Sequence, residues 1–345
     1  MTGNATEYVP QPSWFRRVVR LLLVFVLVLA AAGFLYENIS EARDRRFNPM
    51  LGERVEIRGG IDRPSFKMHI YCSGQGTPVV VLDAGLGDSY VTWQKVQPQI
   101  AKFTRVCSYD RAGMGYSDSS PQARSSQSIA DELQWLLLNA YIPSPYILVG
   151  HSMGGYDVRV FASEYRNEVA GMVLVDAAHP DQENRFPPKL RAMERSWQRE
   201  AEFLEYTMPF GIPRLIGFCD DDPVVRAAEC NFHTARETVA EIKLLPKSAA
   251  ETAATPTLGD LPLAVLSRDP DKPSADLPAD VAESANQAWE KMQEELAHLS
   301  TRGTHTIAKN SAHYIQDDRP DVVVEAVQAV LDQARAGPSA SAVKR

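Results

Sequence analysis

Strand-like and helix-like patterns alternate along most of this 345-residue chain, and this alternation most constrains its fold. The strand-like runs are short and apolar, and the helix-like segments carry apolar residues at helical spacing. The runs are residues 66–72, 78–83, 105–110, 146–149, 169–176, 261–267 and 304–309, and the helical patterns are 93–103, 125–139, 153–164, 281–300 and 321–335. Such alternation predicts a mostly parallel sheet with helices on both faces.

One long segment interrupts the alternation between two strand-like runs. It contains two helical patterns, residues 189–205 and 224–243, and is rich in charged and aromatic side chains. We interpret it as a helical cap inserted into the core. The predicted division is a charged linker at 37–53, a core at 54–180 and 258–335, the cap at 181–257 and a disordered polar tail at 336–345.

The N-terminus differs from this globular part. Arg16, Arg17 and Arg20 precede residues 21–36, a run without any charged side chain. With Val18 and Val19 added, the run reaches the roughly 17–25 residues that a spanning helix needs. We therefore predict a transmembrane anchor at 18–36, a cytoplasmic segment at 1–17 and the remaining chain outside the cytoplasm.

A cleaved signal peptide is the alternative, because residues 30–33 are small (Ala-Ala-Ala-Gly). An uncleaved anchor is favoured, since the apolar run continues through residues 34–36, past this candidate cleavage site. A core helix is disfavoured because the run is apolar all round. The anchor implies the membrane as a partner, and cleavage implies a secreted or periplasmic protein.

Charge and cysteine content exclude some classes of function. The net charge is −8, and no basic stripe with interleaved aromatic residues indicates a nucleic-acid partner. No cysteine pair has C-x-x-C spacing, so neither zinc nor another metal is predicted. Four cysteines allow three pairings in an oxidising compartment. Cys219 and Cys230 can close a local loop, Cys72 and Cys107 lie near strand ends, and free thiols are the alternative for both pairs.

A G-x-S-x-G motif spans residues 150–154 and contains Ser152. It lies between a strand-like run and a helical pattern, where a sharp turn holds the serine hydroxyl away from the backbone. Small neighbouring residues let such a turn tighten, and the N-terminus of the following helix favours an oxyanion. This context predicts that Ser152 is a catalytic nucleophile rather than part of an ordinary turn.

A catalytic serine needs a base, for which the chain offers seven histidines. His313 follows the last strand-like run and precedes a helical pattern, so it can lie over the serine, and we predict it as the base. His179 is the alternative, or a cap residue. Structural roles are expected for His69, His151, His233, His298 and His305.

Three aspartates can orient the histidine. Asp269 follows the strand-like run 261–267, at the end of the strand where catalytic groups lie in open α/β sheets, and we predict it as the acid. Asp271 and Asp176 remain alternatives, because each of the three can instead cap a turn. The order Ser152, Asp269, His313 is the one associated with this serine motif.

The oxyanion needs two backbone N–H donors. One is Met153, directly after the serine. The second is expected in residues 84–87 (Ala-Gly-Leu-Gly), where the glycines allow a close backbone approach, and Leu86 is our choice.

In these motifs the chain resembles the α/β-hydrolase superfamily, in its capped, single-domain, esterase-like branch. The resemblance covers residues 53–335 and rests on segments 83–87, 109–117, 150–154 and 311–314. It implies a mostly parallel eight-stranded sheet with helices on both faces and an inserted helical cap. It also implies that Asp110 and Arg111 brace the loop beside the site, and that the strands of Cys72 and Cys107 are neighbours joined by a disulfide.

The chain departs from this family at two places. It has Ala84-Gly85 where His-Gly is common, and Ser267-Arg268-Asp269 where Gly-x-x-Asp is common. We expect a cofactor-free serine hydrolase that acts on a small-molecule ester or acyl substrate. Amidase, peptidase, lactonase, acyltransferase and a non-catalytic membrane-tethered binding module are the alternatives. Dehalogenase and epoxide hydrolase chemistry is disfavoured, because in this family it resembles an aspartate-nucleophile mechanism.

Overall fold

A computed structural model of the chain describes residues 14–58, 64–272 and 278–337. The predicted segments 1–17 and 336–345 lie mostly outside the described residues. Eight strands form one sheet in the order β1-β2-β4-β3-β5-β6-β7-β8. They are β1 (Glu53–Ile57), β2 (Phe66–Ser73), β3 (Val79–Asp83), β4 (Val106–Tyr109), β5 (Tyr146–His151), β6 (Val169–Val175), β7 (Leu263–Arg268) and β8 (Gly303–Ala308).

The sheet is parallel from β4 to β8, and only β1 and β2 pair antiparallel with their neighbours. This confirms the predicted mostly parallel, eight-stranded sheet. The sequence patterns missed β1, an edge strand whose polar side chains give no apolar run. Because the parallel strands end at one edge, the segments that follow β3, β5 and β6 meet there.

Helices cover both faces of the sheet. One face carries α3 (Ser126–Asn139), α4 (Gly154–Glu164) and α10 (Ala279–Ala297). The other carries η1 (Tyr90–Trp93), α2 (Gln97–Ile100), α11 (Ile315–Asp318) and α12 (Pro320–Ala336), and η2 (Arg166–Glu168) precedes β6. The two faces share the central strands, since alternate strand residues point in opposite directions.

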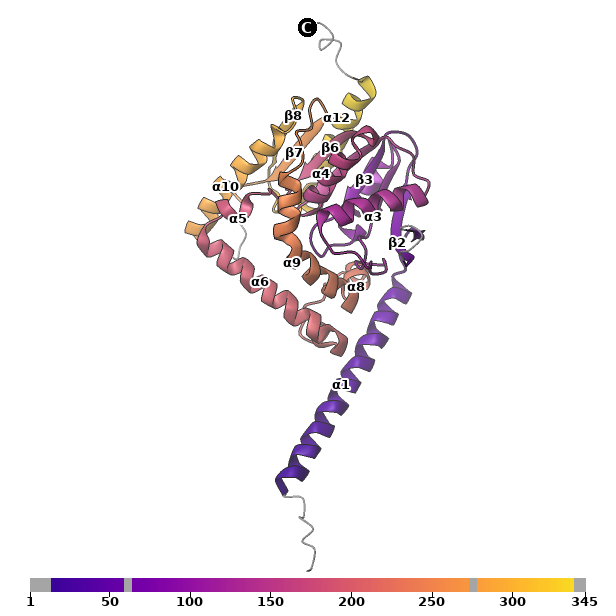
Figure 1. Cartoon of the computed structure of the whole chain (residues 1–345), viewed down its shortest axis with the longest axis vertical. Coiled ribbons are helices and arrows are strands. Elements are labelled where there is room, and N and C mark those ends of the chain that lie inside the picture. Colours follow the sequence, from indigo (N-terminus) through magenta and orange to yellow (C-terminus); the bar gives the residue numbers. More distant parts are fainter. Residues whose placement is uncertain (1–13, 59–63, 273–277, 338–345) are drawn as a thin grey trace, which may run out of the picture.

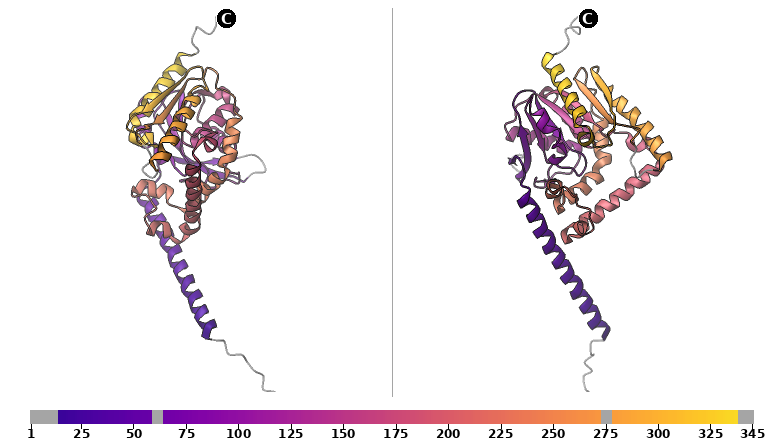
Figure 2. Two further views of the ribbon diagram at one scale, coloured as in Figure 1. Left: turned by 90° about the vertical axis from the view of Figure 1, so that its left-hand side faces the viewer. Right: turned by 180° about the vertical axis from the view of Figure 1, so that it is seen from behind.

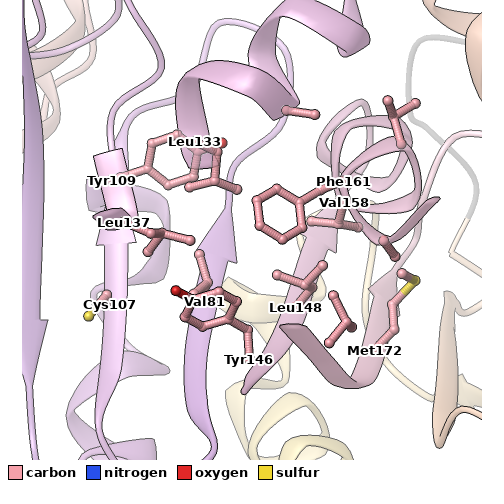
Figure 3. Close-up of a cluster of buried hydrophobic side chains, with 14 of the residues drawn as sticks. Val81, Cys107, Tyr109, Leu133, Leu137, Tyr146, Leu148, Val158, Phe161 and Met172 are labelled. Atoms are coloured by element: carbon pink, nitrogen blue, oxygen red, sulfur yellow. The ribbon is translucent and has the colours of Figure 1, made fainter. Parts of the chain in front are cut away.

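Strand β5 illustrates how the core forms. Tyr146 and Leu148 pack into the cluster under α3 and α4, whereas Ile147 and Val149 pack with α12 on the opposite face. Figure 3 shows the first cluster, in which α3 and α4 place side chains such as Phe161 over the strands. Burial of each such side chain contributes about 1.5–3 kcal/mol to the stability of the fold, so these clusters stabilise the sheet on both faces.

The segment between β6 and β7 carries the helices of the predicted cap. They are α5 (Gln182–Arg185), α6 (Pro188–Thr207), η3 (Met208–Phe210), α7 (Ile212–Leu215), α8 (Pro223–Glu229) and α9 (Phe232–Ala253). Figure 1 shows the long helices α6 and α9 at one end of the core. We call residues 181–257 the cap.

Helix α1 (Trp14–Phe47) projects away from the core (Figures 1 and 2). Its apolar N-terminal part is mostly exposed, and α1 is the single helix in the described ranges long and apolar enough to cross a membrane. The helix continues through the charged residues 37–46, part of the predicted linker, and this end packs against the cap.

Two disulfides connect parts of this fold. Cys72–Cys107 joins β2 to β4, whose register places these residues opposite each other. Cys219–Cys230 closes a loop in the cap. Both predicted disulfides are present, and none of the four cysteines is a free thiol.

Candidate active site

Ser152 occupies a sharp turn between β5 and α4. Its φ is +51°, a left-handed conformation that is uncommon for a residue other than glycine. The turn is also tight, because a Cβ on Gly150 would lie 2.5 Å from Gly154 O and one on Gly154 would lie 2.6 Å from Ala84 O. The two glycines are therefore required for the backbone to pass, as the motif predicts.

His313 lies in the loop after β8 and contacts Asp176 at the end of β6. The distance between His313 Nδ1 and Asp176 Oδ2 is 2.6 Å. The carboxylate is fully buried and also accepts hydrogen bonds from Arg268 N (3.0 Å), Arg268 Nη1 (3.0 Å) and Trp289 Nε1 (2.7 Å). Burial alone would raise the pKa of Asp176, but Arg268 and His313 hold it well below its usual range.

The choice of Asp269 as the partner of His313 is therefore wrong for this structure. The Asp269 carboxylate instead accepts from Lys309 Nζ (3.0 Å), Asn310 N (2.8 Å) and Asp271 N (3.1 Å). Asp271 contacts Lys309 at 3.3 Å. The reason is strand order: β6 lies directly beside β5, which carries the serine turn, whereas β7 is one strand further away.

The electrostatics of His313 suit a base. Burial lowers its pKa below the usual histidine value, and the hydrogen bond to Asp176 opposes this shift only in part. The His313 carbonyl lies 3.1 Å from His151 Nε2, and the two rings are 4.7 Å apart. Among the described residues, no hydrogen bond joins Ser152 Oγ to His313, and in unliganded sites such contacts are often long.

His179, the alternative base, lies in the loop between β6 and the cap. Its Nδ1 accepts from Asp181 N at 3.2 Å, and its Nε2 lies 3.6 Å from Glu295. Burial lowers its pKa to about 4. Within the described ranges, no hydrogen bond or ion pair joins its ring to Ser152 or Asp176.

The predicted oxyanion donors belong to Leu86, in the loop after β3, and to Met153, directly after Ser152. Within the described residues, neither Leu86 N nor Met153 N donates to a protein acceptor, although both side chains pack in one small cluster. Two unused N–H groups beside a strained serine suit an incoming oxyanion.

Arg111 holds the loop that contains Leu86. Its Nη1 and Nη2 donate to Ala84 O and Gly85 O, each at 2.6 Å. The same guanidinium is paired with Asp83 (3.1 Å) and, through Nε, with Glu241 (2.9 Å) of α9. Arg111 thus joins the loop to both the sheet and the cap.

The neighbouring Asp110 is also structural in its contacts. It accepts from Tyr90 N (2.7 Å) and Tyr116 N (3.0 Å) and lies 2.8 Å from the buried His69. These contacts join residues 110–116 to η1 and β2, next to the loop at residues 84–87 that Arg111 holds.

Comparison with known proteins assigns the family. A family model described as alpha/beta hydrolase fold matches residues 77–214, which include the serine motif. The sheet order and the strand–turn–helix around Ser152 agree with this match. The chain belongs to the α/β hydrolase superfamily.

The relatives of this hydrolase are distant. YqjL of Bacillus subtilis (strain 168) is 29% identical over 251 residues, 72% of this chain and 82% of YqjL. The chain spans only 43% and 48% of two other curated relatives. A thermophilic esterase from Thermogutta terrifontis has a TM-score of 0.59 at 22% identity, over 82% of this chain and 99% of that one.

Another solved structure, the epoxide hydrolase CorEH, has a TM-score of 0.58 at 16% identity, over 81% of this chain and 98% of that one. At such identities the similarity establishes the fold alone. Because an esterase and an epoxide hydrolase share it, the reaction of this hydrolase must be argued from its own residues.

A cavity of about 690 Å³ lies over Ser152, between the core and the cap. Leu86, Ser152 and Met153 line its floor, and cap residues from α6 and α9 line its walls. Among the lining residues whose side chains are described, Arg191, Arg195 and Lys243 are cationic and Glu183 is anionic. In the described ranges, no group of three or more His, Cys, Asp or Glu side chains could hold a metal ion.

Arg268 and Trp289 hold Asp176, and sequence patterns did not indicate either residue. They reach the carboxylate from β7 and α10, which only the packing of the sheet brings together. A local sequence signal for them is absent, because neither residue has a fixed spacing from the serine motif.

Proposed function

We propose that this hydrolase cleaves carboxylic esters by acyl transfer through Ser152. Neutral His313 accepts the proton of Ser152 Oγ while the oxygen attacks the ester carbonyl, and Asp176 stabilises the imidazolium that forms. Leu86 N–H and Met153 N–H donate to the oxyanion. His313 then gives its proton to the leaving alcohol, and a water activated by His313 releases the acid.

One observation carries this proposal: the 2.6 Å contact between His313 and the buried Asp176 lies at the sheet edge that also carries the strained Ser152 turn. A serine at this position favours acyl transfer over the aspartate-nucleophile mechanism. Cleavage of amides or lactones, and acyl transfer to an acceptor other than water, use the same residues. We favour esters because an alkoxide leaves more easily than an amine anion.

We also propose that α1 is an uncleaved anchor and that the catalytic part lies outside the cytoplasm. Arg16, Arg17 and Arg20 on the N-terminal side support this orientation. The two disulfides suit an oxidising compartment.

A fluorophosphonate probe tests the catalytic proposal. The full-length chain should be labelled, while Ser152→Ala should not be labelled and should not hydrolyse p-nitrophenyl acetate. Equal labelling of the Ser152→Ala variant would refute the assignment of the nucleophile. The matched p-nitroanilide should react much more slowly than the ester, and the reverse preference would favour an amidase.

A further inference from the structure

Apolar side chains are exposed along one end of the cap. They come from the end of α6, from η3 and α7, and from the loop that follows. We call them the apolar rim: Phe203 (46% exposed), Tyr206 (71%), Phe210 (39%), Leu215 (66%), Ile216 (54%) and Phe218 (50%). The three elements contact one another, so these side chains gather in one region. Exposed apolar patches of this kind mark interaction surfaces.

The cap backbone beside the rim packs against the C-terminal part of the apolar run of α1. A Cβ on Gly33 would lie 2.5 Å from Phe210 O, and a Cβ on Gly211 would lie 2.7 Å from the Tyr36 ring. The backbone of η3 therefore packs directly on α1 between residues 33 and 36. Figure 2 shows this end of the cap beside the part of α1 nearest the core.

A buried cluster of charged side chains also joins the cap to α1, closer to the C-terminal end of the helix. Arg214 donates to Glu37 (3.2 Å) and Asp44 (2.5 Å), and Arg226 Nε lies 3.4 Å from Asp44. At a rise of about 1.5 Å per residue, Glu37 lies about 6 Å and Asp44 about 17 Å beyond Gly33 along the helix axis. The charges thus lie beyond the apolar run, whereas Phe210 lies beside its last turn.

A second cavity, of about 530 Å³, is lined both by this end of the cap and by the loop after β3. Met208, Pro213 and Phe218 line it near the rim, and Leu86 and Gly87 of the oxyanion loop line its other end. Leu86 also lines the cavity over Ser152. A substrate that enters beside the rim would therefore meet the oxyanion loop.

From this arrangement we infer that the apolar rim is inserted into the interface of the bilayer that α1 crosses, so that the hydrolase takes its ester from the membrane. This inference rests on the proposed function, and it makes the substrate an amphiphilic acyl ester dissolved in lipid. The bilayer is the occupant because the rim continues the apolar surface of α1 at the same height. Aromatic and aliphatic side chains of this kind favour the membrane interface.

Fluorescence quenching tests the insertion directly. The full-length chain is reconstituted in phosphatidylcholine vesicles with or without brominated acyl chains, as the parent protein and as Ile216→Trp. The added tryptophan emission should be quenched by the brominated lipid. Leu138→Trp is the matched control. Leu138 is 57% exposed on α3, which belongs to the α/β core and not to the cap, so the emission of a tryptophan there should not be quenched. Quenching of Ile216→Trp no greater than that of the parent protein, which already carries Trp14 in α1, would overturn the inference.

Hydrolysis supplies the functional test. Leu215→Asp/Ile216→Asp should cleave a long-chain monoacylglycerol in vesicles on the order of tenfold more slowly than wild type, because a charge disfavours interfacial insertion. Its hydrolysis of soluble p-nitrophenyl acetate should be unchanged, since neither residue lines either cavity. Leu138→Asp should match wild type on both substrates.

The outcomes separate this inference from the proposed function. If wild type cleaves neither ester and Ser152 is not labelled, the proposed function fails. If wild type cleaves p-nitrophenyl acetate and the double variant retains full activity in vesicles, membrane insertion is wrong. A third outcome would assign the rim to a second copy of the chain and overturn the inference. In this outcome the tryptophan of Ile216→Trp is not quenched, and wild type forms a dimer that Leu215→Asp/Ile216→Asp does not form.

Discussion

At the scale of single residues, the most informative assignment is that of the carboxylate that orients His313. Asp176 has the contact with His313, a buried carboxylate and a pKa held low by Arg268, whereas Asp269 has none of the contacts with His313. We expect Asp176→Asn to lower kcat by up to about 10⁴-fold, because the imidazole loses its fixed tautomer and its counter-charge. Steady-state kinetics on p-nitrophenyl acetate measure this loss.

Asp269→Asn is the matched control, since it makes the same change at the end of the adjacent strand. Its kcat should stay within a few-fold of wild type. A loss in Asp269→Asn equal to that in Asp176→Asn would contradict the proposed triad.

The pH dependence should report the environment of His313. Burial lowers its pKa below the usual histidine value of about 6.5, and the base must be neutral to act. The acidic limb of kcat/KM should therefore have its midpoint below pH 6.5, with full activity retained above it. A pH profile of ester hydrolysis measures the midpoint, and a value above 7 would contradict this assignment.

The sequence offered local signals for two of the three residues of the proposed triad and left the acid open among three aspartates. Ser152 has a local motif, and His313 has a distinctive place after the last strand. The acid has neither, because Asp176 and Asp269 each directly follow a strand and begin a loop. Only the adjacency of β6 to β5 separates them, together with the turn that gives Asp176 a φ of +42°.

At the scale of elements, Arg111 links a strand, a loop and a cap helix. Arg111→Met would leave Asp83 and Glu241 buried without their cation, which typically costs about 3–5 kcal/mol. We expect this loss in the free energy of unfolding by urea, followed by circular dichroism. Arg319→Met, which breaks an exposed pair with Asp321, should cost no more than about 1 kcal/mol. Equal losses in the two variants would show that the buried cluster adds nothing.

Helices α6 and α9 place cations in the cavity over Ser152, although the chain as a whole is acidic. Arg191 and Arg195 line this cavity, and neither has a carboxylate partner among the described side chains. An ester with an anionic acyl group should therefore be preferred. Arg191→Met/Arg195→Met should lower kcat/KM for p-nitrophenyl hemisuccinate by about 2- to 10-fold, an ordinary range for partly screened charges, and leave p-nitrophenyl butyrate unchanged.

Arg199→Met provides the comparison for that experiment. Arg199 lies on the same helix but does not line the cavity, so both esters should react as with wild type. If Arg199→Met reproduces the selective loss, general surface charge rather than the cavity accounts for the preference.

Some helices and strands could be predicted from the sequence, and others could not. Long apolar or amphipathic segments such as α3, α12 and the parallel strands have strong periodicity, and the structure has them close to the predicted ranges. Strand β1 is polar and is recognised only by its pairing with β2, while the charged end of α1 depends on a partner distant in sequence, since Glu37 and Asp44 bind Arg214. Such partners leave no local pattern.

At the scale of the whole molecule, the anchor, the disulfides and the cap imply one orientation. The cap packs against α1 next to the end of the apolar run that lies away from Arg16, Arg17 and Arg20. The proposed membrane span of α1 therefore puts the core on the opposite side of the membrane from those arginines. We expect protease added to intact spheroplasts of a bacterial host to digest the catalytic part of the full-length chain. Alkaline carbonate should leave the undigested chain in the membrane pellet.

The basic residues provide the control for this orientation. Arg16→Glu/Arg17→Glu/Arg20→Glu should reduce the protease-accessible fraction, because basic residues retain the flanking segment in the cytoplasm. The trapped fraction should also lack the Cys72–Cys107 and Cys219–Cys230 disulfides, which the reducing cytosol disfavours. Full protection of the wild-type chain until lysis, with four free thiols, would place the hydrolase in the cytoplasm and reverse the assignment.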